Sequence, residues 1–234
     1  MLLEHADAIA ERLALAGAQV AELAQEERVR LRIGAFPTAL SGFVPAAVDR
    51  LRTRSPELKV IVDEGASDDL PARVRSGELH LAVAFQDAAR PRREYPGLDR
   101  RDLLRERFVV ALPPAHPLAG RDAVRLADLA EDDWSTASTD GMTVRACRAA
   151  GFEPRLVSIT RDQLAISGLI ARGLAVTLAP ELMAEGFERV ALRPIEGEAP
   201  ERDVFVLLPP GGRHSLADAA VAALMELAGE RSWR

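Results

Sequence analysis

The alternation of apolar strands with helices, which begins near residue 31, constrains the fold of this chain more than any other feature. Strands are predicted at residues 31–36, 58–65 and 79–85, where the last two read "LKVIVDEG" and "LHLAVAF". Helices are predicted between them, at 43–53 and in the stretch "SDDLPARVRSGEL", because Pro56 stops the first and Gly77 lies near the end of the second. This order predicts a parallel sheet with right-handed crossovers.

A second unit of similar construction follows. The stretch from Leu98 to Pro113 predicts two further strands. Beyond it, strands at "RLVSI" and "LAVTLAP" alternate with helices at "TVRACRAAGF" and "DQLAISGLIARG". The last strand, "RDVFVLLPP", and the last helix are expected to return to the first unit, which gives two connections and therefore a hinge with a cleft.

The predicted fold class is therefore α/β, with two Rossmann-like lobes joined by a hinge. Lobe I is expected to comprise residues 31–112 plus 203–234, and lobe II residues 113–202.

Residues 1–28 form a separate unit with a heptad pattern. Apolar residues recur at alternating spacings of four and three, as in the seam of a coiled coil. The seam consists of Leu2, Ala6, Ile9, Leu13, Ala16, Val20 and Leu23. A helix that lies on its own domain is the alternative, but such a helix usually has a wider apolar stripe. We therefore expect a linker and dimerisation helix that pairs with another chain.

Charge and cysteine content exclude several classes of protein. The net charge of −6 disfavours direct binding to nucleic acid, which needs a basic patch. Cys147 is the only cysteine, so no internal disulfide can form, and neither a secretory leader nor a membrane span is recognisable. These features predict a cytoplasmic protein without contact to a membrane.

No group of residues suggests catalysis or metal binding. The histidines are scattered without metal-ligand spacing, at His5, His80, His116 and His214. Motifs for a nucleophile or a phosphate loop are missing, and Cys147 is expected to be a small buried residue. We therefore expect no enzyme activity, no cofactor and no metal.

An ordered set of motifs resembles the LysR-type transcriptional regulators over essentially the whole chain. After the heptad helix come "LRIGAFPTALSGFVPAAVDRLRTRSPELKVIVDEG", "DDLPARVRSGELHLAVAF", "VVALPPAHPLAG" and "LIARGLAVTLAP". "SGELHLAVAF" and the "HPLAG" turn carry most of the weight. Two departures are visible: Ala175 stands where a second glycine is usual, and Ala66-Ser67 stands where a pair of hydroxyls is common.

The resemblance implies a linker helix followed by a periplasmic-binding-protein-like effector domain. It also implies self-association, as a homodimer or homotetramer, with effector domains paired side by side and antiparallel. The family's winged helix-turn-helix, through which DNA would be bound, has no counterpart in the sequence. Because the seam begins at Leu2, we expect the chain to be a fragment of a longer regulator.

Hydroxyl side chains at three helix starts make an anion site plausible in the cleft. Parallel strands and helix N-termini point to one edge of a sheet, and free N–H groups there favour an anion. By resemblance, the effector contacts are Thr38 and Ser41; Ala66 and Ser67; Ser135, Thr136, Ser138 and Thr139; and Thr160, Arg161 and Gln163, with Phe85 and Val110 as an apolar wall. The alternatives are that Ser41, Ser67 and Ser138 only cap helices, that Arg161 is a solvated charge and that Phe85 is core.

The leading hypothesis is a regulator of transcription that senses a small carboxylate in the cleft between the lobes. A solute-binding protein of a transport system would share the fold, but it would need export. An enzyme on the same fold would need an acid, base or nucleophile set, which the sequence lacks. The expected partners are a small-molecule effector and further copies of the chain.

Overall fold

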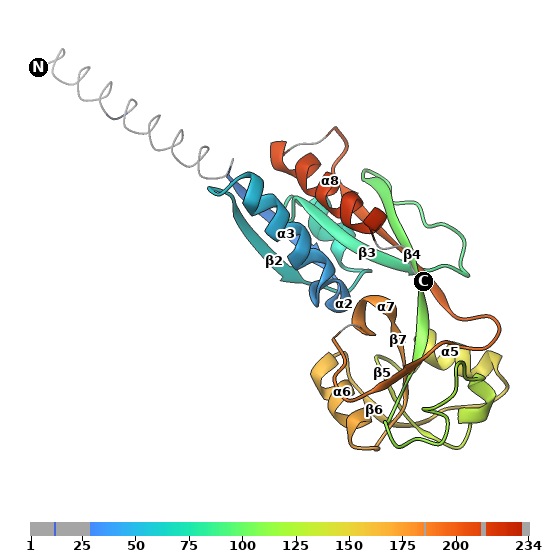
Figure 1. The fold of residues 1–234 in the computed structure, drawn as a ribbon. Coiled ribbons are helices and arrows are strands. Elements are labelled where there is room, and N and C mark those ends of the chain that lie inside the picture. The colour runs from blue at the N-terminus through green and yellow to red at the C-terminus, as the bar shows by residue number, and fades with distance from the viewer. Residues whose placement is uncertain (1–11, 13–28, 185, 212–213, 231–234) are drawn as a thin grey trace, which may run out of the picture.

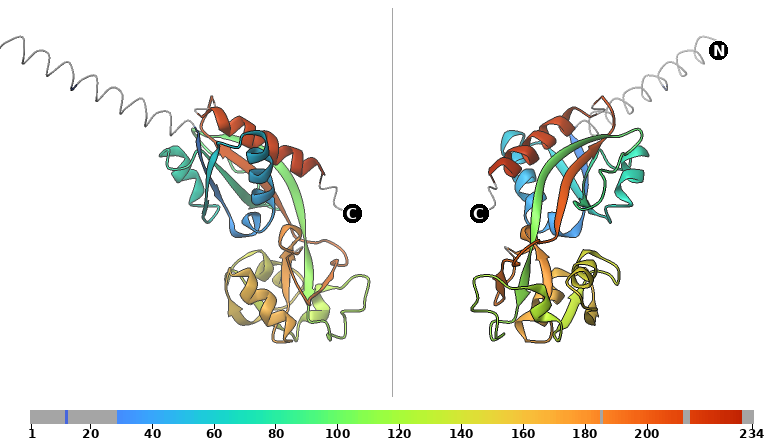
Figure 2. Two further views of the ribbon diagram at one scale, coloured as in Figure 1. Left: turned by 60° about the vertical axis from the view of Figure 1, so that its left-hand side comes forward. Right: turned by 90° about the vertical axis from the view of Figure 1, so that its right-hand side faces the viewer.

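The computed structural model describes residue 12 and residues 29–184, 186–211 and 214–230. The predicted linker helix and all seven of its seam residues therefore lie outside the described residues. The described chain forms two lobes, one above the other in Figure 1, and Figure 2 shows strands passing from one lobe to the other.

A mixed sheet of seven strands forms the framework of both lobes. Its strands are β1 (Arg30–Ala35), β2 (Lys59–Glu64), β3 (Leu81–Asp87), β4 (Asp99–Leu112), β7 (Thr177–Pro180), β8 (Ala191–Arg193) and β9 (Glu201–Leu208). The order is β2-β1-β3-β9-β4-β7, with β8 also paired to β4. The pairs β1–β2 and β1–β3 are parallel, as the strand–helix alternation predicts, whereas β9 runs antiparallel to both β3 and β4.

Helices cover the two faces of this sheet in lobe I. The helices of the described residues are α2 (Pro37–Leu40), α3 (Phe43–Arg54), α4 (Leu70–Arg75), the 3-10 helix η1 (Leu126–Leu129), α5 (Met142–Ala149), α6 (Gln163–Ala171), α7 (Glu181–Ala184) and α8 (Ser215–Glu230). Buried residues of α3 and α8 pack with alternate residues of β1, β3 and β9 in one apolar core. On the other face, Leu70 and Val74 of α4 pack with Phe205 and Leu207.

Lobe II has its own core and a small second sheet. Strands β5 (Asp133–Thr136) and β6 (Arg155–Ile159) pair in parallel. Trp134 is fully buried in this core, and its indole N–H donates a hydrogen bond to the Leu129 carbonyl oxygen over 3.2 Å. Val110 is also fully buried here, so the suggestion that it forms a cleft wall is wrong.

Strand β4 belongs to both lobes. Its 14 residues form one strand, so the prediction of two strands between Leu98 and Pro113 is wrong; a bulge between Asp102 and Leu104 is the only interruption of its pairing with β9. Residues 99–107 pair with β9, and residues 108–112 pair with β7 and β8. The second passage between the lobes is the segment between β8 and β9. The division into lobes at residues 112 and 202 stays a prediction, but the change of strand partners falls inside β4.

Gly34 allows α4 to approach β1 closely. A Cβ atom built on Gly34 would lie 2.7 Å from Leu70 Cδ2 and would also collide with Leu79 Cδ1. Leu70 also lies 2.7 Å from the position of a Cβ on Gly65. The two glycines thus let the Leu70 side chain lie against the carboxyl ends of β1 and β2, which fixes the loop that carries Ala66 and Ser67.

We expect the substitution Gly34→Ala to lower the free energy of unfolding by about 1–3 kcal/mol, because the methyl group overpacks the core around Leu70. Urea unfolding followed by circular dichroism measures this change. Gly120→Ala is the matched control, since nothing lies within 4 Å of its Cβ position. Equal stability of the two variants would contradict the close-approach role of Gly34.

Candidate functional site

Pairs of side chains meet across the gap between the lobes at two places, α2 with α6 and β3 with α5. Ser41 Oγ, at the end of α2, donates a hydrogen bond to Gln163 Oε1 at the start of α6 over 2.6 Å. Arg145 Nη2, on α5, lies 2.7 Å from Asp87 Oδ2 at the end of β3. The carboxyl ends of the lobe I strands therefore face the helix starts of lobe II, which is the edge where we expect a ligand.

Thr38 and Ser67 each have a hydroxyl whose oxygen already accepts a hydrogen bond. Thr38 Oγ1 accepts from Arg202 Nη2 over 2.6 Å, and Ser67 Oγ accepts from the Phe85 N–H over 3.2 Å. The O–H groups of both remain able to donate, which is the role that an anionic ligand requires. Both residues are half-buried, as is Ala66.

The hydroxyl residues of lobe II lie in more varied surroundings. Ser135 and Thr136 are buried in β5; Ser135 Oγ has no hydrogen-bond partner within the part of the chain that the structure describes, and Thr136 Oγ1 donates to the Ser138 carbonyl oxygen over 2.8 Å. Ser138 is half-buried and Thr139 is exposed. These bonds hold the loop between β5 and α5 in place, and they leave the Thr136 proton engaged within the loop.

The turn before α6 is built mainly by Asp162. Its carboxylate accepts hydrogen bonds from the N–H groups of Leu164 and Ala165, and the Asp162 N–H donates to Thr160 Oγ1 over 3.1 Å. Arg161 is exposed. Asp162 rather than a hydroxyl therefore caps α6, and Thr160 positions Asp162.

Capping does not account for the three serines. No hydroxyl side chain caps α3, α4 or α5, whose N-cap residues are Gly42, Asp69 and Gly141. The alternative that Ser67 caps the second helix is wrong, because α4 begins at Leu70 and its N-cap residue is Asp69. The sequence hides this start because Ser67, Asp68 and Asp69 are all good capping residues.

A buried ion pair lies under this edge, and sequence reasoning missed it. Arg202 is 4% exposed and Glu106 is fully buried; Arg202 Nε donates to Glu106 Oε1, and Glu106 Oε2 accepts from the Leu182 N–H over 3.0 Å. Burial lowers the pKa of the Arg202 guanidinium, and the Glu106 carboxylate opposes that shift. Neither position stands out in the sequence, because each lies between two other charged residues, in "RERFVV" and "ERDVFV".

Three phenylalanine rings surround the Arg202 guanidinium. Its central carbon lies 4.6 Å from the ring centre of Phe85, 4.7 Å from that of Phe36 and 5.6 Å from that of Phe108. Phe36 and Phe85 also meet edge to face, with their ring centres 4.9 Å apart. Phe85 is half-buried and belongs to this cage, next to Thr38 and Ser67, as well as packing against the lobe I core.

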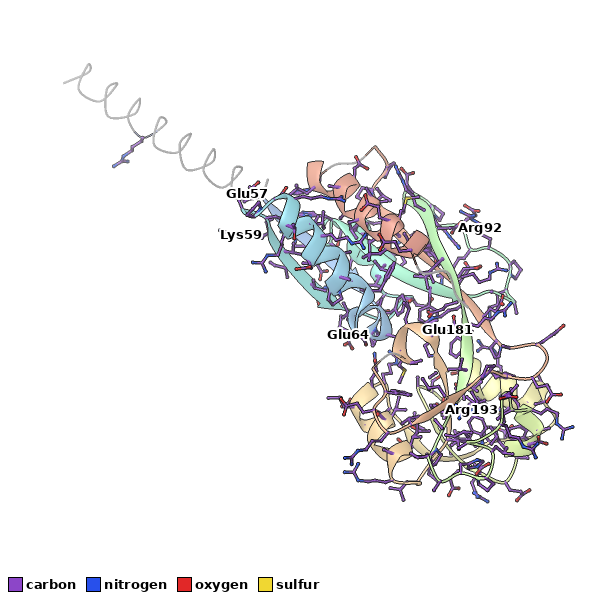
Figure 3. The ribbon with its side chains drawn as sticks, viewed as in Figure 1. Glu57, Lys59, Glu64, Arg92, Glu181 and Arg193 are labelled. Atoms are coloured by element: carbon purple, nitrogen blue, oxygen red, sulfur yellow. The ribbon has the colours of Figure 1, made fainter. Side chains whose placement is uncertain are left out.

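Glu181 adds a second carboxyl group close to the hinge. Figure 3 shows it between the lobes, and its carboxylate accepts a hydrogen bond from the Arg107 N–H over 3.4 Å. Burial raises the pKa of Glu181, an effect that the Arg107 N–H opposes. The folded state therefore favours the protonated form of Glu181. Its contribution to the free energy of unfolding is fully present below the unfolded-state pKa and is lost as the pH rises through the folded-state pKa.

Other chemistry has little support within the described residues. Cys147 is fully buried, as expected, and burial raises its thiol pKa to about 12. No three His, Cys, Asp or Glu side chains of the described ranges come together as metal ligands. None of the helices described is long and apolar enough to cross a bilayer. Two cavities, of about 460 and 450 Å³, are lined by none of the predicted effector residues.

Sequence comparison finds a family model and several regulatory proteins that are similar to this chain. The "LysR substrate binding domain" family model matches residues 24–232. The chain is 29% identical over 199 residues to the "Transcriptional dual regulator GltC" of Bacillus subtilis, covering 82% of the chain and 64% of that protein. It is 32% identical over 217 residues to the "Small neutral protease regulatory protein" of Streptomyces coelicolor, covering 87% and 66% respectively.

Solved structures share the fold. The C-terminal domain of a probable LysR family transcriptional regulator from Rhodococcus sp. RHA1 has a TM-score of 0.67 and 26% identity, over 85% of this chain and 98% of that one. The BenM effector binding domain with its effector benzoate has a TM-score of 0.70 and 18% identity, over 88% and 94%. The effector binding domain of QuiR in complex with shikimate has a TM-score of 0.68 and 16% identity, over 86% and 98%.

Two lobes that share strands, with donors gathered at the edge between them, define a periplasmic-binding-protein-like α/β domain. The chain belongs to the LysR substrate-binding domain family, and it is the effector-binding domain of a LysR-type regulator. It spans between 54% and 67% of the length of eight curated relatives that it matches.

Proposed function

We propose that this domain senses a small carboxylate between its lobes and passes the signal to DNA-reading heads elsewhere in the full protein. The observation that carries the proposal is the pair of hydroxyls at Thr38 and Ser67, each already accepting a hydrogen bond and each with its proton free to donate. Benzoate is the named effector of one structural relative, and another was solved in complex with shikimate; both compounds carry a carboxylate and support this ligand class.

The bridging contacts suggest how a ligand would act. A carboxylate between Thr38 and Ser67 of lobe I would also meet the lobe II loop that holds Ser138 and Thr139. By contacting both lobes it would favour one arrangement of them, and the shift in population equals its difference in affinity for the two arrangements. This role requires no catalysis, and we propose that the protein acts in the cytoplasm as a regulator and not as an enzyme.

The double substitution Thr38→Val/Ser67→Ala is expected to weaken the binding of a carboxylate effector about tenfold or more, because it removes two hydrogen bonds to a charged group. Benzoate and shikimate are the first probes, followed by a set of metabolite acids, with the dissociation constant measured by titration calorimetry.

Thr53→Val is the matched control for this experiment. Thr53 is exposed on α3 and, among the described residues, its hydroxyl bonds only to the Asp49 carbonyl oxygen of its own helix, over 3.0 Å. If an acid bound the wild-type chain and the Thr38→Val/Ser67→Ala variant with the same dissociation constant, the site between the lobes would be disproved.

An apolar surface supports self-association of the domain. Strand β2 is an edge strand of the large sheet and β6 belongs to the small sheet, and both expose large apolar side chains. These side chains are Ile61 and Val62 of β2 and Val157 and Ile159 of β6; Leu164, at the start of α6, adds a fifth, and the five are exposed by 41% to 83%. An uncovered strand edge with apolar side chains favours pairing with another chain. We propose that this β2–β6 surface pairs with a second copy, and that the predicted seam of residues 2–23 adds a further contact within a homodimer or homotetramer.

A further inference from the structure

The cavity of about 460 Å³ in lobe I is lined by arginines that the proposed effector site does not use. It lies between the loop that follows β3 and the strands β4 and β9. We infer that this arginine cavity, defined by Arg90, Arg92, Arg100 and Arg105, is a second binding site, for a small organic dianion.

The charge of its lining is opposite to that of the whole chain. Four arginines and two aspartates, Asp102 and Asp203, line the cavity, whereas the chain carries a net charge of −6. A local excess of positive charge on an acidic protein concentrates anions at that place. Figure 3 shows Arg92 on the loop beside β4, at the border of this region.

Arg100 is the fixed element of the cavity. Its side chain is 8% exposed and its guanidinium carbon lies 3.8 Å from the centre of the Phe205 ring. Nε donates to Asp102 over 2.8 Å and Nη1 donates to Gln86 Oε1 over 2.6 Å, while no hydrogen bond from Nη2 occurs among the described residues. The planar group is thus held in one orientation with donors still available, the condition for bidentate binding of a carboxylate or phosphate.

The other three arginines of the cavity have more exposed side chains than Arg100. Arg92 pairs with Asp102 over 2.7 Å, and Arg105 pairs with Asp203 over 2.7 Å and lies 3.9 Å from Glu201. Arg90 is exposed, and its side chain forms no ion pair within the described residues. The aspartates therefore hold two guanidinium groups at the cavity and partly neutralise them, and Arg90 and Arg100 keep unused donors.

The arginine cavity and the gap between the lobes lie on opposite faces of the same strands. Arg105 is paired with Asp203 in the β4–β9 ladder, and the next pair along is Glu106 with Arg202. Successive side chains of a strand point to opposite faces. A ligand at Arg105 would therefore be separated by the sheet from a ligand at Thr38, so the two sites can be tested independently.

Size and apolar lining define the class of ligand. A volume of about 460 Å³ lies within the range of small-molecule pockets, and Leu103 and Leu104 contribute apolar surface beside the arginines. An excess of two positive charges matches two negative ones. We therefore assign the site to a dianion with a short carbon skeleton, such as a dicarboxylate or a phosphate monoester.

Succinate and glycerol 3-phosphate separate the two sources of such a dianion. Titration calorimetry of the full chain at about 50 mM salt, where surface charges are only partly screened, should give saturable binding of at least one of them. The variant Arg90→Gln/Arg92→Gln should bind that probe about tenfold more weakly, because it loses two charge-assisted contacts. Both residues are exposed, and circular dichroism should show an unchanged fold.

Two further variants make the outcome decisive. Arg52→Gln/Arg101→Gln removes the same charge from exposed positions outside the cavity and should leave the affinity within about twofold, as expected for weakly coupled surface charges. Thr38→Val should also leave it unchanged. The proposal is overturned if neither probe binds saturably, if both arginine double variants weaken binding equally, or if Thr38→Val abolishes it, since the anion would then bind between the lobes.

Discussion

Replacing Arg202 by methionine is expected to lower the free energy of unfolding by about 3–5 kcal/mol, the usual cost of leaving one partner of a buried ion pair uncompensated. Glu106 has no exposure to water and would keep only the Leu182 N–H as a donor among its present contacts. The substitution also removes the cation from the cage of Phe36, Phe85 and Phe108. Urea unfolding, followed by fluorescence and circular dichroism together, measures the loss.

A neighbouring ion pair provides the control. Arg105→Met removes the cation opposite Asp203, one position along the same two strands, but the Arg105 side chain is 58% exposed. Because water screens that pair, its loss should cost at most about 1 kcal/mol. The double variant Glu106→Leu/Arg202→Met should be less destabilised than Arg202→Met, since no buried charge is left without a partner. If Arg202→Met and Arg105→Met proved equally stable, the Glu106–Arg202 pair would have no special role at the hinge.

Introducing charge on the β2–β6 surface is expected to abolish one level of self-association. The variant Val157→Glu/Leu164→Glu places two carboxylates on a surface whose residues are 51% and 83% exposed in the isolated chain. In a twofold interface each substitution occurs twice, so the interface would contain four added carboxylates. These would be desolvated or would repel one another. We expect the dissociation constant of that interface to rise about 100-fold or more, which corresponds to ~2.7 kcal/mol.

Analytical ultracentrifugation over a range of concentrations measures this effect. Met225→Glu on α8 is the control, because Met225 is 48% exposed but lies outside the β2–β6 surface. If the predicted seam also pairs chains, a tetramer should become a dimer rather than a monomer. An unchanged size distribution, or equal dissociation of the Met225→Glu control, would show that copies do not pair through this surface.

The first half of the fold could be predicted from local pattern because the pattern there is strong. Strands β1, β2 and β3 are short apolar runs with helices between them, and their parallel pairing follows from that order. The length of β4 could not be read in the same way. The charged residues of "LDRRDLLRERF" break its apolar period, and a bulge at Asp102 shifts which side chains face the core, so one long strand resembles two.

The sequence predicted those candidate site residues whose position depends on neighbouring residues in the chain, but not those that come from a distant strand. Thr38 and Ser67 follow strand ends, so their position at the sheet edge follows from topology. Arg202 enters the same region from a strand 164 residues after Thr38 in the chain, and its burial depends on the register between β4 and β9. Periodicity in one strand does not reveal which residue of a distant strand lies opposite, so a buried arginine and an exposed one look alike in the sequence.

The continuity of β4 determines what kind of movement can relate the lobes. Because residues 99–107 pair with β9 and residues 108–112 pair with β7 and β8, β4 cannot slide past either set of partners without breaking backbone hydrogen bonds. Rotation about the strand axis near residue 107 keeps both ladders intact. A bound effector would therefore change the torsion between the two ends of one strand, and assembled copies would receive the signal as a change in the angle at which lobe II is presented rather than as a change in its distance.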